Sequence, residues 1–186
     1  MPRPFEESIV RHCAATLAGH KCGSLFSYRW KAGEQPEDAL KEVNTLLMKK
    51  GICAVALRNQ EGVGLIYVYR VAAIQRQLAR PEVRLFLQKQ GYPIASAAQC
   101  LAHLGKKLTL APGFPHEIGV FLDYPLADVA AFIENEGRNC RCVGCWKAYS
   151  NIDEARRLFA LYRKCRDVYM ACYQRGFGVA RLTVAA

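Results

Sequence analysis

Two β-rich segments, residues 52–57 and 63–69, constrain the fold of this chain more than any other feature. Residues 58–62 separate them and include a glycine, a pattern typical of an antiparallel hairpin with a Gly-containing loop. Apolar side chains occupy both faces of the two segments. Because both faces then need to be covered, we expect the hairpin to be central in the fold.

Segments with the apolar spacing of amphipathic helices lie on both sides of the hairpin in the sequence. Gly19 ends the first of them, and Pro36 suits the first turn of the second. The longest helix is predicted to begin after Asn151, because Asn151 and Glu154 have the spacing of a capping box, and to end near Gly176. The other predicted helices cover residues 5–18, 36–50, 71–90 with a break before Pro81, and 96–104.

These elements predict the fold class. Helices outnumber strands, and the only clear strand pair is antiparallel, which favours an α+β fold over repeated βαβ units. The chain has 186 residues, a length that suits one domain over residues 1–186. We expect helices to cover the central hairpin, with the long C-terminal helix packed across it.

Composition excludes several classes of protein. Apolar residues make up 52% and charged residues 23% of the chain, so disorder is excluded as its main state. The first residues contain no apolar h-region, and no apolar run approaches the roughly 18 residues that a membrane-spanning helix needs. We therefore expect a soluble, cytoplasmic protein with no membrane partner.

Charge is distributed unevenly along the chain, whose formal net charge is +10. Residues 62–112 carry 7 basic and 1 acidic side chains, residues 113–137 carry 5 acidic and no basic ones, and residues 138–186 carry 10 basic and 3 acidic ones. Such clustering could attract an anionic partner or nucleic acid. It is also what a solvated basic surface would show.

Nine cysteines in a cytoplasmic protein predict core residues, metal ligands or redox thiols rather than disulfides. Cys140, Cys142 and Cys145 lie within six residues, so three thiolates could converge on zinc or an iron–sulfur cluster. Nearby aromatic residues are equally consistent with a buried strand, and nearby basic residues with a redox role. The fourth ligand that a metal needs would come from Cys22, His116 or Cys165.

Three further cysteines, Cys13, Cys165 and Cys172, fall on the apolar stripes of predicted helices. A free cysteine at such a position behaves as a small hydrophobic residue. We expect all three to be buried and unreactive.

A Phe-Pro-His-Glu run at residues 114–117 is predicted to start a short helix. His116 and Glu117 could act as a general acid and base, although a glutamate in a first turn is also favoured by the helix dipole. The spacing that follows matches a helix-turn-helix, but residues 125–136 contain no basic side chain. We expect a structural helix pair, and nonspecific, electrostatic contacts to any nucleic acid from the basic flanks.

Five runs carry a resemblance to a known family: His12-Cys13-x-x-Thr16-Leu17-Ala18-Gly19-x-Lys21, Ser24-Leu25-Phe26, residues 114–122, Asp128-Val129, and Trp146-Lys147-x-Tyr149. They resemble domain-of-unknown-function family 3793, and the similarity spans nearly the whole chain. The resemblance implies a stand-alone bacterial protein of similar length and brings no established activity. If a three-thiolate site is not a property of the whole family, His12, Lys21, His116 and Glu117 are the better candidate catalytic residues.

Three hypotheses about function follow. The first is a cytoplasmic binding or redox-accessory protein with a thiol-rich site that could hold a metal at Cys140, Cys142 and Cys145. The second is a module that binds nucleic acid or another anionic partner. The third is an enzyme that uses His116 and Glu117 as acid and base.

Overall fold

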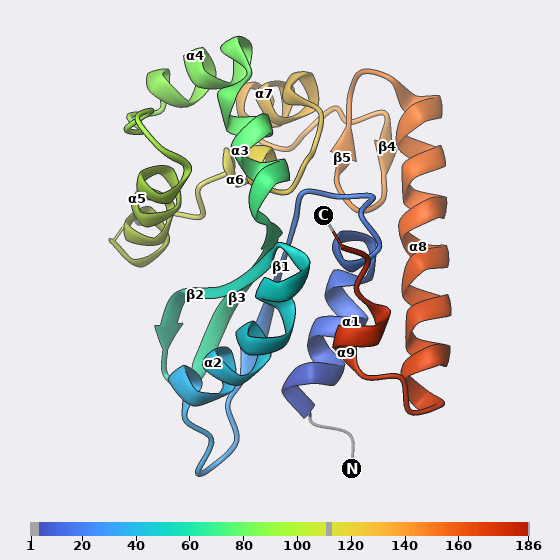
Figure 1. Ribbon diagram of the computed structural model, residues 1–186. Helices are drawn as coiled ribbons and strands as arrows, with labels where there is room; N and C mark the ends of the chain where they lie inside the picture. The colour runs from blue at the N-terminus through green and yellow to red at the C-terminus, as the bar shows by residue number, and fades with distance from the viewer. Residues whose placement is uncertain (1–3, 111–112, 186) are drawn as a thin grey trace.

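The computed structural model describes residues 4–110 and 113–185, in which helices lie on both faces of a small antiparallel sheet (Figure 1). The sheet strands are β1 (Gly23–Arg29), β2 (Ile52–Gln60) and β3 (Val63–Arg70), and a separate short hairpin pairs β4 (Cys142–Val143) with β5 (Lys147–Ala148). The helices are α1 (Pro4–Leu17), α2 (Pro36–Leu47), α3 (Val71–Ala79), α4 (Pro81–Lys89), α5 (Ala97–Leu110), α6 (Ile118–Phe121), α7 (Leu126–Glu134), α8 (Ile152–Gln174) and α9 (Val179–Leu182). This is the α+β domain that the sequence predicts.

The predicted hairpin is confirmed as β2 and β3, and its turn is tighter than expected. Only Glu61 and Gly62 connect the strands, and both have positive φ, 51° and 72°. Two such residues form the turn whose twist matches paired strands. The strand order is β1-β3-β2, so β3 rather than the whole hairpin is central. Strand β1, which was not predicted, pairs with β3 from Gly23 to Arg29.

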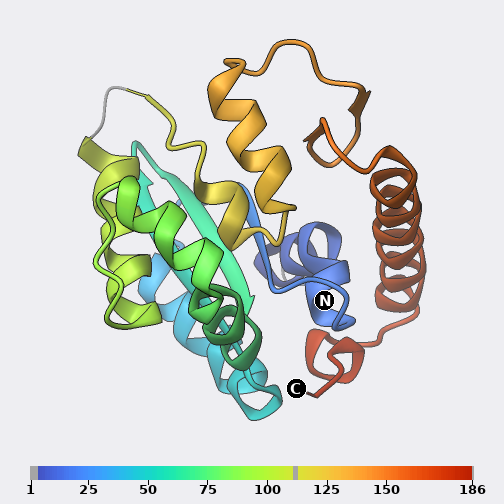
Figure 2. The ribbon, with the colours of Figure 1, turned by 90° about the horizontal axis from the view of Figure 1, so that it is seen from above.

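Alternate residues of β3 belong to two separate cores. Ile66 and Val68 face a core made with α1, α2 and α9, whereas Leu65 and Tyr67 face a core made with α3 to α7. Because side chains alternate along a strand, one apolar strand can supply both cores. Figure 2 shows the resulting layers, with α5 on one side of the sheet and α1 on the other.

Helix α8 does not pack across the hairpin, which corrects the prediction. It packs on α1, where Cys165 contacts Ala14 and Ala15, so that α1 lies between α8 and the sheet (Figure 2). The reason is that apolar residues of α1, such as Ile9 and Val10, already cover that face of the sheet.

Most of the helix boundaries are confirmed. Asn151 caps α8 by accepting a hydrogen bond from the Glu154 amide at 3.2 Å. Two predictions need correction: the helix predicted at residues 96–104 extends to Leu110, and the helix predicted at Phe114 begins only at Ile118. Among the described helices, none has the length and apolar character needed to cross a membrane.

A buried carboxylate joins helix α7 to the β4–β5 hairpin. Asp128 is 2% exposed, and its Oδ2 accepts a hydrogen bond from the Trp146 indole at 2.8 Å. Its Oδ1 accepts hydrogen bonds from the Tyr149 amide, the Ser150 amide and the Ser150 hydroxyl at 3.0, 2.9 and 2.7 Å. Burial alone would raise the pKa of Asp128, but these four donors hold it below its ordinary value.

Replacing Asp128 by Asn is expected to destabilise the protein by about 2–3 kcal/mol, because either orientation of the amide turns its NH2 group toward a hydrogen-bond donor. Urea unfolding at pH 7 measures the loss, with Glu134→Gln on the exposed side of α7 as control. Ionised Asp128 stabilises the fold above its unfolded pKa of about 3.9, and this contribution is lost as the pH falls through the lower folded pKa. A difference between the proteins that did not shrink at low pH would contradict this role.

Candidate functional site

The structure separates His116 from Glu117. Glu117 is 4% exposed, forms an ion pair with Lys107 and accepts a hydrogen bond from the Tyr92 hydroxyl at 3.1 Å. The His116 ring is exposed and lies 4.8 Å from the ring of Phe132, between ring centroids. Because no hydrogen bond joins the imidazole to the carboxylate in the described structure, the geometry gives no support to an acid/base pair.

The contacts of His12 are those of a packed side chain. Its ring stacks on Phe26 with centroids 5.1 Å apart and an interplanar angle of 12°. Burial and, to a lesser extent, the charge of Arg11 lower the pKa of His12. One turn later, the Thr16 and Ser24 hydroxyls share a buried hydrogen bond of 2.8 Å. Two of the runs that carry the family resemblance therefore join α1 to β1.

The three clustered thiols do not share a centre. Cys142 lies on β4 and packs against the core below the short hairpin, whereas Cys145 is exposed near the hairpin turn and Cys140 precedes the strand. Over residues 4–110 and 113–185, no group of three or more His, Cys, Asp or Glu side chains is placed to hold a metal. The described residues therefore give no support to a zinc or iron–sulfur site at these thiols. Of the proposed fourth ligands, Cys22 and Cys165 are buried and His116 is exposed.

The predicted burial of Cys13, Cys165 and Cys172 is confirmed for two of the three residues. Their predicted lack of reactivity stays a prediction. Cys13 and Cys165 are buried, but Cys172 is only partly buried, so its predicted burial is wrong. Burial raises the pKa of Cys13 and of Cys22.

Lys21, between α1 and β1, lies beside two aromatic rings from distant parts of the chain. Its Nζ is 5.1 Å from the centroid of the Tyr124 ring and 5.7 Å from that of Tyr162 on α8. Burial lowers the pKa of Lys21, and the nearby thiols and the carboxylate of Asp123 oppose this shift. No ion pair neutralises Lys21 in the described part of the chain.

Lys21 also borders a cavity of about 460 Å³ that we call the basic cavity. Its cationic side chains are Lys21, Arg70, Arg76 and Arg80, and Asp123 supplies a carboxylate. The remaining lining residues are Gly19, His20, Cys22, Ala72, Ala73 and Gln77. The cavity thus concentrates positive charge between the end of α1 and the start of α3.

The carboxylates available to these residues leave most of the positive charge in place. Arg70 donates only to backbone carbonyls, while Arg80 forms an ion pair with Glu82 at 2.6 Å. Arg76 is exposed and has no partner among the described residues. Asp123 accepts a hydrogen bond from the Cys22 amide at 3.0 Å. Among the described residues, Arg70 and Arg76 therefore have no carboxylate partner, and Lys21 has Asp123 nearby but forms no ion pair with it.

The first turn of α3 adds a second source of positive potential. Ala72 and Ala73 line the basic cavity within this turn, and the preceding Val71 amide already donates to the Gly51 carbonyl at 2.9 Å. Amide groups in the first turn of a helix have no partner within the helix and attract anions. The signal available in the sequence was the presence of Arg70, Arg76 and Arg80 within eleven residues before Pro81.

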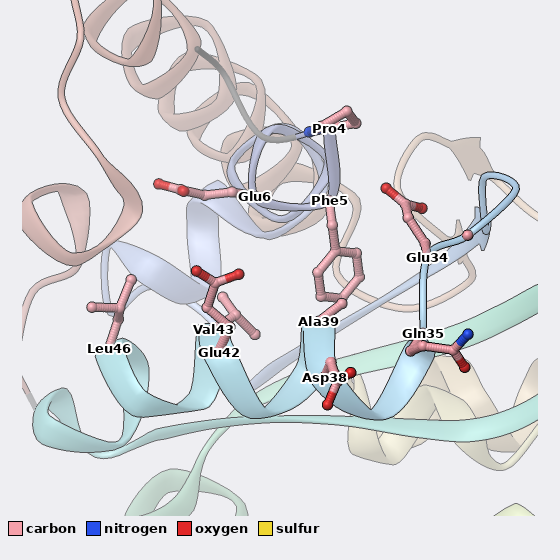
Figure 3. Close-up of a pocket in the computed structure, with 11 residues that line it drawn as sticks. Pro4, Phe5, Glu6, Glu34, Gln35, Asp38, Ala39, Glu42, Val43 and Leu46 are labelled. Atoms are coloured by element: carbon pink, nitrogen blue, oxygen red, sulfur yellow. The ribbon is translucent and has the colours of Figure 1, made fainter.

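An acidic groove of about 370 Å³ between α1 and α2 has the opposite charge. Figure 3 shows Phe5 projecting from α1 toward α2 among the carboxylates of Glu6, Glu34, Asp38 and Glu42. Glu6 accepts a hydrogen bond from the Val179 amide at 2.7 Å, and Glu34 accepts one from the Lys31 amide at 2.8 Å. These bonds give two of the four carboxylates a role in holding the fold.

Native cysteine reactivity should follow burial. We expect iodoacetamide to modify Cys145 in the folded protein, because this residue is exposed, while Cys13 and Cys22 are buried and react only after unfolding. Burial raises the pKa of all three thiols, so access of the reagent makes the difference. Peptide mass spectrometry before and after addition of urea measures this, with Cys145→Ser as control. Labelling of Cys13 at the rate of Cys145 without urea would contradict the described packing.

Comparison with known proteins gives one match. A family model described as a protein of unknown function, DUF3793, matches residues 9–183. No curated protein and no solved structure matches the chain. The matched segment includes the sheet, both cores and the basic cavity. The chain belongs to the DUF3793 family.

Proposed function

We propose that this protein binds a small phosphorylated molecule in the basic cavity. The observation that carries the proposal is that Lys21, Arg70 and Arg76 border one cavity of about 460 Å³ and form no ion pair among the described residues. Cations held close together repel one another, and an anion that enters the cavity relieves this repulsion. The proposed function is therefore binding of an anionic ligand.

Phosphate suits this cavity for chemical reasons. Its oxygens can accept hydrogen bonds from the exposed guanidinium of Arg76, from the Lys21 ammonium and from the first-turn amides of α3. The cavity volume lies within the roughly 300–1,000 Å³ of small-molecule sites. A concave site with these donors favours a compact ligand over an extended polymer.

The basic residues of α8 give less support to nucleic-acid binding. Two of them pair with acidic neighbours on the helix surface, Arg157 with Glu154 at 2.6 Å and Arg166 with Asp167 at 3.1 Å. Such exposed pairs are typical of a solvated helix face. In the basic cavity, Lys21, Arg70 and Arg76 form no such ion pair with any described residue.

Replacing Arg76 by Gln is expected to weaken pyrophosphate binding about tenfold, because a charged hydrogen bond to the ligand is lost. Isothermal titration calorimetry at two salt concentrations measures the change. Arg156→Gln, an exposed arginine on α8, removes the same charge far from the cavity and should leave the affinity unchanged. Equal losses in both variants would show a general charge effect, and tighter binding of mixed-sequence RNA than of pyrophosphate, insensitive to Arg76→Gln, would contradict the proposal.

The affinity for sulfate should decrease as the pH rises above neutrality. Burial lowers the pKa of Lys21, so its ammonium loses its proton earlier than an exposed lysine does, and the neutral amine attracts an anion less. Sulfate keeps its charge over this range, which isolates the protein's titration. Calorimetry from pH 7 to 10 tests this, and Lys21→Met should bind more weakly at pH 7 and lose most of the pH dependence. An unchanged pH profile in Lys21→Met would exclude Lys21 from the site.

A further inference from the structure

A second cavity, of about 280 Å³, lies between α6, α7 and the β4–β5 hairpin. We call it the aromatic cavity, because Tyr124, Phe132 and Trp146 line it together with Phe114 at 47% exposure. It shares no lining residue with the basic cavity. Any ligand that it takes therefore lies outside the function proposed above.

Packing holds the walls of the aromatic cavity in place. The Tyr124 and Trp146 rings are stacked with centroids 5.0 Å apart, and the Trp146 ring also meets the edge of Phe159 at 4.5 Å. The Trp146 indole donates to Asp128 at 2.8 Å. Trp146 is 8% exposed, so these contacts make it a rigid, preformed part of the cavity wall.

The polar groups of this cavity carry an unmatched positive charge. Lys147 donates one hydrogen bond to the Gly137 carbonyl at 2.8 Å and lies 5.7 Å from the centroid of the Phe132 ring. Among the described residues that line it, the one carboxylate is that of Asp128, which already accepts four hydrogen bonds from other groups. Lys147 has no ion pair among the described residues, and its Nζ has two further N–H groups to donate.

His116 adds a second polar group on the same wall. Its ring contacts Phe132 with centroids 4.8 Å apart, so His116 and Lys147 both lie beside that ring. The His116 imidazole forms no hydrogen bond with the described residues and can donate one to a ligand. The cavity thus combines aromatic walls with two nitrogen donors and no free acceptor carboxylate.

We propose that the aromatic cavity binds a small planar aromatic carboxylate, whose ring packs among Tyr124, Trp146 and Phe132 and whose carboxylate pairs with Lys147 and His116. The volume suits a ligand of one or two fused rings, since pockets for drug-sized ligands measure roughly 300–1,000 Å³ and this cavity lies at the low end of that range. A cationic ligand is excluded by Lys147, and a neutral aromatic ligand leaves the ammonium without a counter-charge.

The proposal is tested with naphthalene-2-carboxylate and its neutral analogue naphthalene-2-carboxamide, titrated into the full chain by calorimetry. We expect the carboxylate to bind about tenfold more tightly than the carboxamide, the effect of one good charged hydrogen bond. Lys147→Met should abolish this preference while leaving carboxamide binding unchanged. The matched control Lys106→Met removes an exposed lysine of α5 and should keep the preference.

Two further variants keep the test decisive. If Lys147→Met fails to fold by circular dichroism, the exposed His116→Gln replaces it, with an expected loss of roughly threefold for the carboxylate alone. Arg76→Gln should bind the carboxylate as the unaltered protein does, which distinguishes this cavity from the basic one. Equal affinity for the two compounds, no detectable carboxylate binding, or a carboxylate affinity lost only in Arg76→Gln would overturn the proposal.

Discussion

The arrangement of the sheet and the helices depends on the hydrogen bonds that the Arg70 guanidinium donates. Its Nε donates to the Thr16 carbonyl at 2.7 Å, and its Nη2 donates to the carbonyls of Leu17 and Val184, both at 2.8 Å. Arg70 is 6% exposed and stands at the junction of β3 and α3. One side chain therefore ties the central strand to the end of α1 and to the C-terminal segment. The helix end and the cation suit each other, since the C-terminal carbonyls of a helix are partly negative.

The same interaction explains why the basic cavity keeps its charge. The carbonyls that hold Arg70 are dipoles, so they accept hydrogen bonds from its Nε and Nη2 groups without cancelling its positive charge. A carboxylate in their place would have given an equally well-bonded fold with a neutral cavity floor. Burial lowers the pKa of Arg70, yet an arginine stays protonated at any ordinary pH. The structural role and the proposed binding role thus use one charge.

Local patterns predicted those elements that local sequence determines. The β2–β3 hairpin and the cap of α8 at Asn151 were predicted from spacing alone. Strand β1 was missed because it opens with Gly23, a poor strand former. The structure shows why this position needs a glycine: a Cβ there would lie 2.3 Å from the Tyr67 hydroxyl and 2.7 Å from the Phe121 carbonyl. The need for Gly23 thus comes from residues far along the chain, which no local sequence pattern shows.

For the candidate sites too, the sequence indicated single residues but not the distant residues that surround them. Lys21 and His116 were singled out from the sequence, but their surroundings come from distant segments: Tyr162 of α8 for Lys21, and Phe132 of α7 for His116. Cys140, Cys142 and Cys145, close in sequence, were separated by strand pairing. Proximity in sequence was therefore a poor guide to a shared site. Two consecutive residues nevertheless border different cavities. Asp123 lines the basic cavity, and Tyr124 lines the aromatic cavity. Because Asp123 has a positive φ of 62°, this segment turns sharply, and neighbouring residues can border two cavities of different chemistry.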